Sequence, residues 1–205
     1  MKSSFNEDYY EAGVETGVSL YSNYRWIPEL TIPFAAHICE LLGIRWGQTV
    51  LDFGCAKGYL VYALRLLHRE AYGVDISDYA LARAPQGISP YLRHDIGGLG
   101  RRTFDWIIAK DVLEHIPTPQ LHKTLLDLRK ASKKMFVIVP LGSEGSYVVP
   151  AMHNDATHEI CEDLTWWTDR LTDAGFSAWT ASYRIEGMKD HWASYEKGHA
   201  FITCT

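Results

Sequence analysis

The sequence predicts an α/β fold in which helices cover both faces of a largely parallel sheet. Three observations support this prediction. The chain has 205 residues and is 47% hydrophobic, which suits one domain with a large core. Short apolar runs alternate with helical patterns through the middle of the chain, as in doubly wound sheets. One such run, residues 49–53, leads into a turn with two glycines and then a helical pattern. This strand–loop–helix unit brings backbone N–H groups close to a ligand.

Residues 5–27 are rich in aromatic residues and glycine, which indicates a short helix and a loop. Pro28 opens a helix to about Leu42, and Gly43 can serve as its C-cap. Strands are then expected near 49–53, 71–75, 89–94, 103–109 and 134–140, with helices near 59–68, 78–84 and 118–132. A helix near 163–174 ends at Gly175, and two further strands are expected at Ser177–Ile185 and His199–Cys204. No repeat or linker divides the chain, so residues 1–205 form a single predicted domain.

The turn after the first strand has the pattern Asp-x-Gly-x-x-x-Gly, from Asp52 to Gly58. The dinucleotide fingerprint requires glycine at two positions that are here Ala56 and Tyr59, and the phosphate-loop pattern requires Ser or Thr after Lys57-Gly58. A carboxylate at Asp52 would repel a pyrophosphate but attract a cationic amino-acid group. S-adenosylmethionine carries an ammonium and a sulfonium and no phosphate. The turn therefore favours S-adenosylmethionine over a nicotinamide dinucleotide.

A second apolar run, residues 71–74, ends at Asp75. A carboxylate at this place can accept hydrogen bonds from both hydroxyls of a ribose. The alternative role for Asp75 is a helix N-cap, but Ser77 and Asp78 are better placed to cap the following helix. We therefore expect Asp75 to hold the cofactor ribose.

Three stretches together carry a family resemblance: Leu51–Gly58, Gly73–Ser77 and Phe104–Ile116. They resemble, in order and spacing, motifs of class I S-adenosylmethionine-dependent methyltransferases of the type 11/12 kind, over residues 48 to 140. The resemblance implies a Rossmann-like, mostly parallel seven-stranded sheet with a C-terminal antiparallel hairpin. It also implies an enzyme that transfers a methyl group from S-adenosylmethionine to an acceptor oxygen or nitrogen.

The same resemblance extends the expected cofactor site. Gly54 and Gly58 would let the turn pass close to the methionine portion, and Asp95 and Ile96 would contact the adenine. The alternative for Asp95 is a plain turn residue. Relatives often place N-terminal aromatic residues against the methionine end, and residues 1–45 are therefore interpreted as a helical segment that includes a mobile lid over 9–26. The alternative is a permanently docked extension. The expected cofactor-binding residues are Tyr21, Tyr24, Asp52, Gly54, Cys55, Ala56, Gly58, Asp75, Ile76, Asp95, Ile96, Lys110 and Asp111.

The resemblance also implies that the loop after the fifth strand, residues 141–162, contacts the acceptor, and this loop is rich in histidine and acidic residues. His153 or His158 can act as the general base that removes a proton from the acceptor. A metal site built from His153, Asp155, His158 and Cys161 is a second interpretation, but its spacing matches no strong zinc pattern, so no metal is assigned. The third interpretation is a loop whose histidines only bond the backbone. His115 is expected to be structural, and His191 and Trp192 are expected near the same cleft.

Composition limits the function classes. The net charge of −5 argues against a nucleic-acid partner and favours a small-molecule acceptor. No apolar run approaches the roughly 20 residues of a membrane span, and the N-terminus lacks an apolar signal segment. Four separated cysteines indicate free thiols and a cytoplasmic location. Two alternatives stay open: a non-catalytic cofactor-binding regulatory protein, and chemistry on the sulfonium other than methyl transfer.

Overall fold

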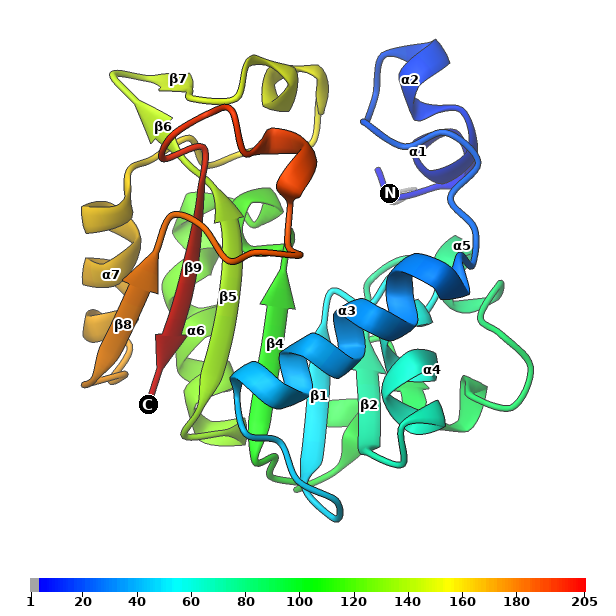
Figure 1. The fold of residues 1–205 in the computed structure, drawn as a ribbon. Helices are drawn as coiled ribbons and strands as arrows, with labels where there is room; N and C mark the ends of the chain where they lie inside the picture. Colours follow the sequence, from blue (N-terminus) through cyan, green and yellow to red (C-terminus); the bar gives the residue numbers. More distant parts are fainter. Residues whose placement is uncertain (1–3) are drawn as a thin grey trace.

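A seven-stranded sheet forms the centre of the computed structural model, which describes residues 4–205 (Figure 1). Its strand order is β3-β2-β1-β4-β5-β9-β8. The first five strands in this order run parallel, whereas β9 is antiparallel to both β5 and β8. The strands are β1 (Thr49–Phe53), β2 (Glu70–Val74), β3 (Leu92–Arg93), β4 (Trp106–Lys110), β5 (Met135–Pro140), β8 (Trp179–Ser182) and β9 (His199–Cys204). The predicted fold class, including the C-terminal antiparallel hairpin, is confirmed.

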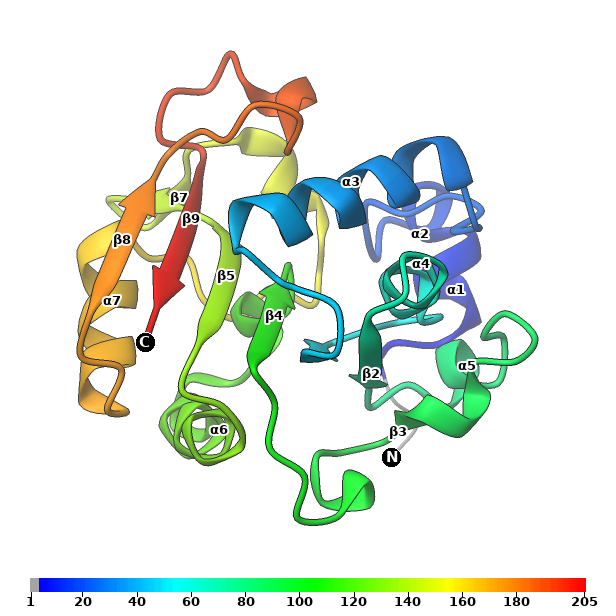
Figure 2. The same cartoon turned by 60° about the horizontal axis from the view of Figure 1, so that its bottom comes forward.

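Helices cover both faces of the sheet, and Figure 2 shows α3 and α6 on opposite sides. The helices are α1 (Glu7–Glu11), α2 (Gly13–Thr16), α3 (Pro28–Leu41), α4 (Tyr59–Leu66), α5 (Asp78–Leu81), α6 (Thr118–Ala131) and α7 (Leu164–Asp173). Side chains alternate along the strands, so Val50 and Ile108 pack with the α3 and α4 residues, while Leu51 and Ile107 pack with α6 and α7. Both faces are buried, as parallel sheets require.

Prolines explain where two elements are shorter than expected. The strand expected over 89–94 is confined to Leu92–Arg93, because Ser89–Tyr91 forms a 3₁₀ turn that contains Pro90, which cannot donate to a sheet ladder. The helix expected over 78–84 ends at Leu81, and Pro85 disfavours helical backbone at the residue before it. The strand expected over 177–185 covers only Trp179–Ser182.

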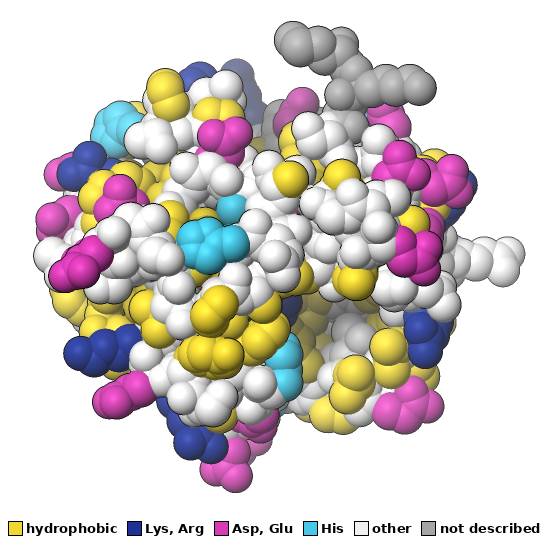
Figure 3. Space-filling view, turned by 90° about the horizontal axis from the view of Figure 1, so that it is seen from above, with side chains coloured by type: hydrophobic (Ala, Val, Ile, Leu, Met, Phe, Trp, Pro, Cys, Tyr) yellow, Lys and Arg dark blue, Asp and Glu magenta, His cyan; other side chains and the backbone are white. Residues whose placement is uncertain are grey.

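The segment 141–162, expected as a loop, contains short regular structure. A two-stranded hairpin, β6 (Gly142–Ser143) with β7 (Ser146–Tyr147), is followed by a 3₁₀ turn at Pro150–Asn154. Together with the N-terminal helices and the segment 186–198, this segment lies over the carboxyl ends of the parallel strands (Figure 1). Figure 3 looks down on this face, where histidine side chains are visible near the middle.

The N-terminal segment is more tightly packed than its sequence suggests. Its apolar residues lack a regular period, which predicts a poor core element, yet Tyr9 and Tyr10 are buried and form a cluster with Ala80 of α5. Ser19 is also buried, and its hydroxyl donates to the Tyr9 carbonyl. The structure therefore shows this segment docked on the domain. All four cysteines are free thiols, as expected, and no described helix is long and apolar enough to cross a membrane.

Candidate functional site

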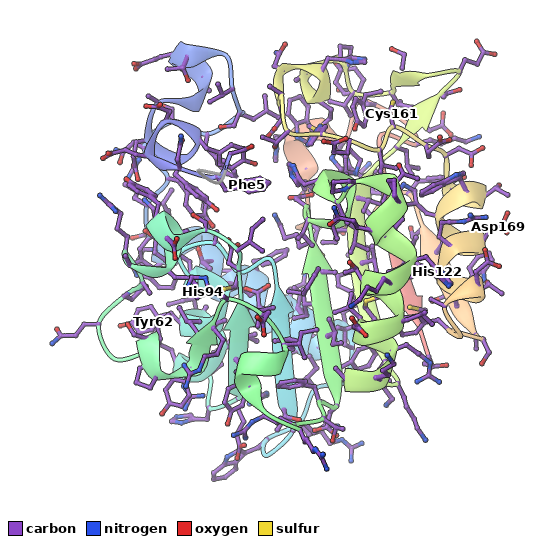
Figure 4. The ribbon with its side chains drawn as sticks, turned by 180° about the vertical axis from the view of Figure 1, so that it is seen from behind. Phe5, Tyr62, His94, His122, Cys161 and Asp169 are labelled. Atoms are coloured by element: carbon purple, nitrogen blue, oxygen red, sulfur yellow. The ribbon has the colours of Figure 1, made fainter. Side chains whose placement is uncertain are left out.

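A cavity opens at the carboxyl ends of β1, β2 and β4, where ligands bind in open α/β sheets. The N-terminal segment forms its opposite wall. In Figure 4, Phe5 and His94 are labelled on this side of the molecule, one on the N-terminal segment and one just after β3. The lining residues are Phe5, Tyr9, Tyr10, Tyr21, Phe53, Gly54, Ala56, Val74, Asp75, Ile76, His94, Asp111, Val112, His115 and Ile116.

The turn after β1 needs glycine for its backbone. Gly54 and Gly58 have φ angles of 79° and 74°, in the left-handed region that favours glycine. A side chain at Gly54 would also run into Val112, and one at Gly58 would come within 2.8 Å of Ile88 Cδ1. Gly54 lines the cavity, whereas Gly58 does not, so packing and φ explain Gly58 without a ligand.

Cys55 and Ala56 complete this turn in different ways. The Cys55 side chain is buried, and a Cβ at Gly73 of β2 would lie 2.7 Å from its sulfur, so the turn packs tightly on that strand. Burial raises the pKa of this thiol well above its usual range. Ala56 lines the cavity in a left-handed conformation, with φ of 49°. Its N–H points to the end of β2.

Asp75 connects the turn to the start of α5. Its Oδ2 accepts the Ala56 N–H at 2.7 Å, and its Oδ1 accepts the Ser77 N–H at 2.8 Å. Burial raises the pKa of this carboxyl, opposed by the two N–H donors. Ser77 caps α5 through a bond from the Ala80 N–H, so the cap role belongs to Ser77 as expected. The two fixed bonds aim the Asp75 carboxylate at the cavity while each oxygen keeps acceptor capacity.

Asp52 is a buried carboxylate that lacks a polar partner among residues 4–205. It is 4% exposed, and no hydrogen bond or ion pair reaches it from the described part of the chain. Burial raises its pKa from 3.8 to about 7, while the Lys110 ammonium acts in the opposite direction. Asp52 does not line the cavity but lies in β1 directly before Phe53 and Gly54, which do. A buried carboxylate of this kind is costly unless a cation or a proton satisfies it.

Lys110 and Asp111 form an ion-paired group with a residue that sequence reasoning missed. Lys110 Nζ and Lys189 Nζ lie 2.5 Å and 2.6 Å from Asp111 Oδ2. Burial alone would raise the pKa of Asp111, but the two ammonium groups hold it well below its usual range. Asp111 lines the cavity with a φ of 51°. No pattern in the segment 186–198 singled out Lys189, and His191 and Trp192 do not line this cavity.

Lys57, inside the glycine turn, was also missed. Its side chain is 6% exposed, and its ammonium donates to Glu11 Oε1 and to the Tyr24 carbonyl, both at 2.5 Å. Both partners belong to the N-terminal segment. Lys57 therefore holds this segment against the turn after β1. In the sequence, the signal for this role was a lysine inside the glycine turn.

The N-terminal tyrosines divide into two groups. Tyr21 lines the cavity, whereas Tyr24 is not among the lining residues and its ring packs against Tyr59. Trp26 packs on Tyr59 and Tyr62. Phe5, Tyr9 and Tyr10 also line the cavity. Tyr9 and Tyr10 lie in the segment interpreted as a lid, but neither they nor Phe5 were singled out as contacts.

The expected adenine contacts lie outside the cavity wall. Asp95 is exposed, and its Oδ1 accepts the Gly98 N–H at 2.8 Å, the arrangement of a turn aspartate. Ile96 does not line the cavity either, whereas the neighbouring His94 does. Ile76 lines it with a side chain that is 66% exposed.

The two histidines expected as bases occupy different environments. His153 is exposed and outside the cavity wall, and its Nε2 accepts the Tyr147 N–H at 3.1 Å. His158 is half-buried, and its ring lies 4.7 Å from that of His115, which lines the cavity. Burial lowers the pKa of His158, and burial together with His158 lowers that of His115 to about 4.

The metal set considered from the sequence is not supported by the contacts of its members. Asp155 accepts hydrogen bonds from the hydroxyls of Tyr9 and Thr157, while Cys161 packs against Gly142. Among residues 4–205, the group close enough to share one ion is a different one: Glu114, His115 and His158. Two of its three members follow β4, and one of these, His115, was expected to be structural.

Comparisons with known proteins agree on one kind of domain. A family model described as "Methyltransferase domain" matches residues 31–199. A search of curated proteins by sequence found no match. Similar solved structures include a SAM dependent methyltransferase from Archaeoglobus fulgidus, with 14% identity, a TM-score of 0.63, and coverage of 87% of this chain and 97% of that one.

Two further structures share the fold. The magnesium protoporphyrin IX methyltransferase of Synechocystis, solved with bound SAH, has 18% identity, a TM-score of 0.60, and coverage of 85% of this chain and 81% of that one. A candidate O-methyltransferase from Nostoc punctiforme has 15% identity and a TM-score of 0.60. The alignment covers 86% of this chain but only 57% of that longer protein. At these identities the likeness concerns the fold.

Proposed function

Because the chain belongs to the methyltransferase-domain family, we propose that it binds S-adenosylmethionine in the cavity at the ends of β1, β2 and β4 and methylates a small molecule. The acceptor atom is an oxygen or a nitrogen. The reaction is an in-line displacement: the acceptor lone pair forms a bond to the methyl carbon as the carbon–sulfur bond breaks. The sulfonium becomes the neutral thioether of S-adenosylhomocysteine, and an O–H or N–H acceptor gives up its proton.

The orientation of Asp75 is the observation that carries the cofactor proposal. Its carboxylate is fixed by the Ala56 and Ser77 N–H groups and borders the cavity, so it can accept the two ribose hydroxyls. The neighbouring Asp52 is a buried carboxylate that needs a positive partner, and the ammonium of the methionine end would supply one. A dinucleotide would instead place a pyrophosphate beside these two carboxylates.

The remaining cavity wall supports a small, partly aromatic acceptor. Phe5, Tyr9, Tyr10 and Tyr21 supply aromatic surface, and aromatic rings also stabilise a nearby sulfonium through cation–π contacts. His94 and His115 both line the cavity, and the lowered pKa of His115 leaves it neutral near pH 7. A neutral imidazole can accept the proton that the acceptor loses. We therefore assign the role of general base to His115, whose ring contacts that of His158, and not to His153.

Calorimetric titration with S-adenosylhomocysteine tests the cofactor proposal. Each hydrogen bond to a charged acceptor contributes about 1.5–3 kcal/mol to the binding free energy, and Asp75 would accept two from the ribose. Asp75→Ala should therefore weaken binding at least tenfold, while Asp169→Ala on the exposed face of α7 should bind like the wild type. Binding of NAD with none of S-adenosylhomocysteine would overturn the proposal. Unchanged affinity in a folded Asp75→Ala variant would reduce Asp75 to a structural role.

A further inference from the structure

Three side chains beside the cavity are left with unsatisfied lone pairs: Glu114, His115 and His158. A carboxylate oxygen of Glu114 and one ring nitrogen of each histidine lie within 4.8 Å of one another. Glu114 and His115 belong to the 3₁₀ turn Leu113–His115 that follows β4, and His158 comes from the segment 141–162. The fold thus brings together groups from two distant parts of the chain at the edge of the cavity.

The hydrogen bonds of the two histidines fix their tautomers. His158 Nδ1 lies 2.9 Å from the Met152 carbonyl oxygen, which can only accept, so Nδ1 carries the proton. The Thr157 hydroxyl gives its proton to Asp155 at 2.5 Å, so its oxygen accepts from His115 Nδ1 at 2.8 Å. Both neutral rings therefore present Nε2 as a free lone pair. This is the arrangement by which proteins orient metal-binding histidines.

Glu114 supplies the third lone pair and the need for a cation. The residue is 1% exposed, and its Oε2 has no hydrogen-bond partner among residues 4–205. Among residues 4–205, no hydrogen bond joins Glu114 to either histidine, although the three potential ligand atoms lie close together. A buried carboxylate oxygen without a partner is costly, and a proton or a cation held between it and the two histidine nitrogens would remove that cost.

We propose that Glu114, His115 and His158 bind a divalent transition-metal ion such as Zn²⁺. Two imidazole nitrogens and one carboxylate oxygen are a donor set that Zn²⁺ accepts, and three protein ligands leave a coordination position open. His115 lines the cavity, so an open position beside it would border the place where the acceptor binds. With an ion bound, His115 Nε2 would be a ligand and no longer the base, and the ion would assist the loss of the acceptor proton in its place. The hydrogen-bonded chain from Tyr9 through Asp155 and Thr157 to His115 holds one ligand in place.

The surrounding charges indicate what occupies the open position. Lys110 and Lys189 both pair with the single carboxylate of Asp111, so two ammonium groups face one carboxylate at this end of the cavity. A bound divalent cation leaves this end of the cavity positive. An acceptor that arrives with an ionisable oxygen, such as a phenol, an enol or a carboxylic acid, would bind there as its anion. This acceptor class rests on the proposed methyl transfer, whereas the cation site does not.

Metal titration of the full chain tests the site. After removal of adventitious metal with EDTA, Co²⁺ is titrated and followed by its visible absorption, and Zn²⁺ is titrated by calorimetry. The wild type should bind one equivalent of each, with the intense Co²⁺ bands of a low-coordinate nitrogen-containing site. Glu114→Gln and His158→Gln should each lose at least tenfold in Zn²⁺ affinity. The matched control is His122→Gln, an exposed histidine on α6 labelled in Figure 4, which should bind like the wild type.

The outcomes separate this inference from the proposed function. A wild type that binds S-adenosylhomocysteine but neither metal, or shows only the weak Co²⁺ spectrum of a water-coordinated ion, overturns the metal site and leaves the methyltransferase proposal standing. Zn²⁺ affinity unchanged in folded Glu114→Gln and His158→Gln variants also overturns it. The wild-type Co²⁺ spectrum requires no substitution, so the test does not depend on how well the variants fold. Metal binding without S-adenosylhomocysteine binding would support the site and contradict the proposed function.

Discussion

At the residue scale, Ala56 stands in a backbone conformation that usually belongs to glycine. Its φ of 49° is left-handed, and its N–H is committed to Asp75. A left-handed backbone costs an L-residue roughly 1–2 kcal/mol, and glycine recovers this at an entropic cost of about 0.4–1 kcal/mol. Ala56→Gly should therefore raise the free energy of unfolding by about 0.5–1 kcal/mol. Urea denaturation measures the change.

The matched control for Ala56→Gly is the reverse change at the next glycine. Gly58→Ala places a Cβ at a φ of 74° and against Ile88, so it should lower the free energy of unfolding. The two variants should shift the denaturation midpoint in opposite directions. A destabilised Ala56→Gly variant would contradict the account of this turn.

Asp52 makes the stability of the free protein depend on pH. Burial raises its pKa from 3.8 to about 7, so the folded state binds its proton more tightly than the unfolded chain does. Its stabilising contribution is full below about pH 4 and is lost as the pH rises through about 7. Asp52→Asn stays neutral and should therefore gain stability over the wild type between pH 5.5 and pH 8.5. Asp169→Asn should show no such pH-dependent gain in the same urea titrations.

The same ionisation has the opposite sign for cofactor binding. The ammonium of S-adenosylhomocysteine should favour the ionised Asp52, so wild-type affinity should rise from pH 6 to pH 8. Asp52→Asn should lose that rise. Equal affinity of wild type and variant at both pH values would separate Asp52 from the cofactor.

At the element scale, the N-terminal segment is held by Lys57 and forms one wall of the cavity. We predict that residues 9–26 act as a lid, so S-adenosylhomocysteine should increase their protection from hydrogen exchange, and a lid that excludes water suits a displacement at a charged centre. Lys57→Met removes the contacts to Glu11 and Tyr24, and it should speed exchange in this segment and weaken binding.

Lys130→Met, at an exposed position of α6, is the control for the lid experiment. It should leave both exchange over residues 9–26 and cofactor affinity unchanged. If protection of residues 9–26 is equal with and without S-adenosylhomocysteine, the segment is a permanently docked extension.

At the scale of the whole molecule, the sequence predicts most of the fold because its signals are local. Apolar runs, Pro28, Gly43 and the glycine turn each specify an element from a few neighbouring residues, and the parallel order follows from their alternation. The errors also have local causes, such as Pro90 within the expected third strand. The hairpin β6–β7 was missed because its strands have only two residues each.

The sequence predicts only the part of the site that is formed by residues at the ends of the strands. Asp75, Gly54 and Ala56 follow directly from strand ends and line the cavity. Lys189, Phe5 and the pairing of His115 with His158 depend on segments far apart in sequence, which only tertiary packing brings together. His153 was expected at the acceptor because its loop is rich in histidine, but its ring instead accepts a backbone N–H within that loop.

The most direct test of the central claim is a crystal structure of the full chain with S-adenosylhomocysteine. The account predicts the ligand in the cavity at the ends of β1, β2 and β4, with both ribose hydroxyls on the Asp75 carboxylate and the ammonium toward Asp52. The remaining space should be bordered by the N-terminal tyrosines and His115. A ligand bound elsewhere, or in this cavity with its ribose away from Asp75, would contradict the account.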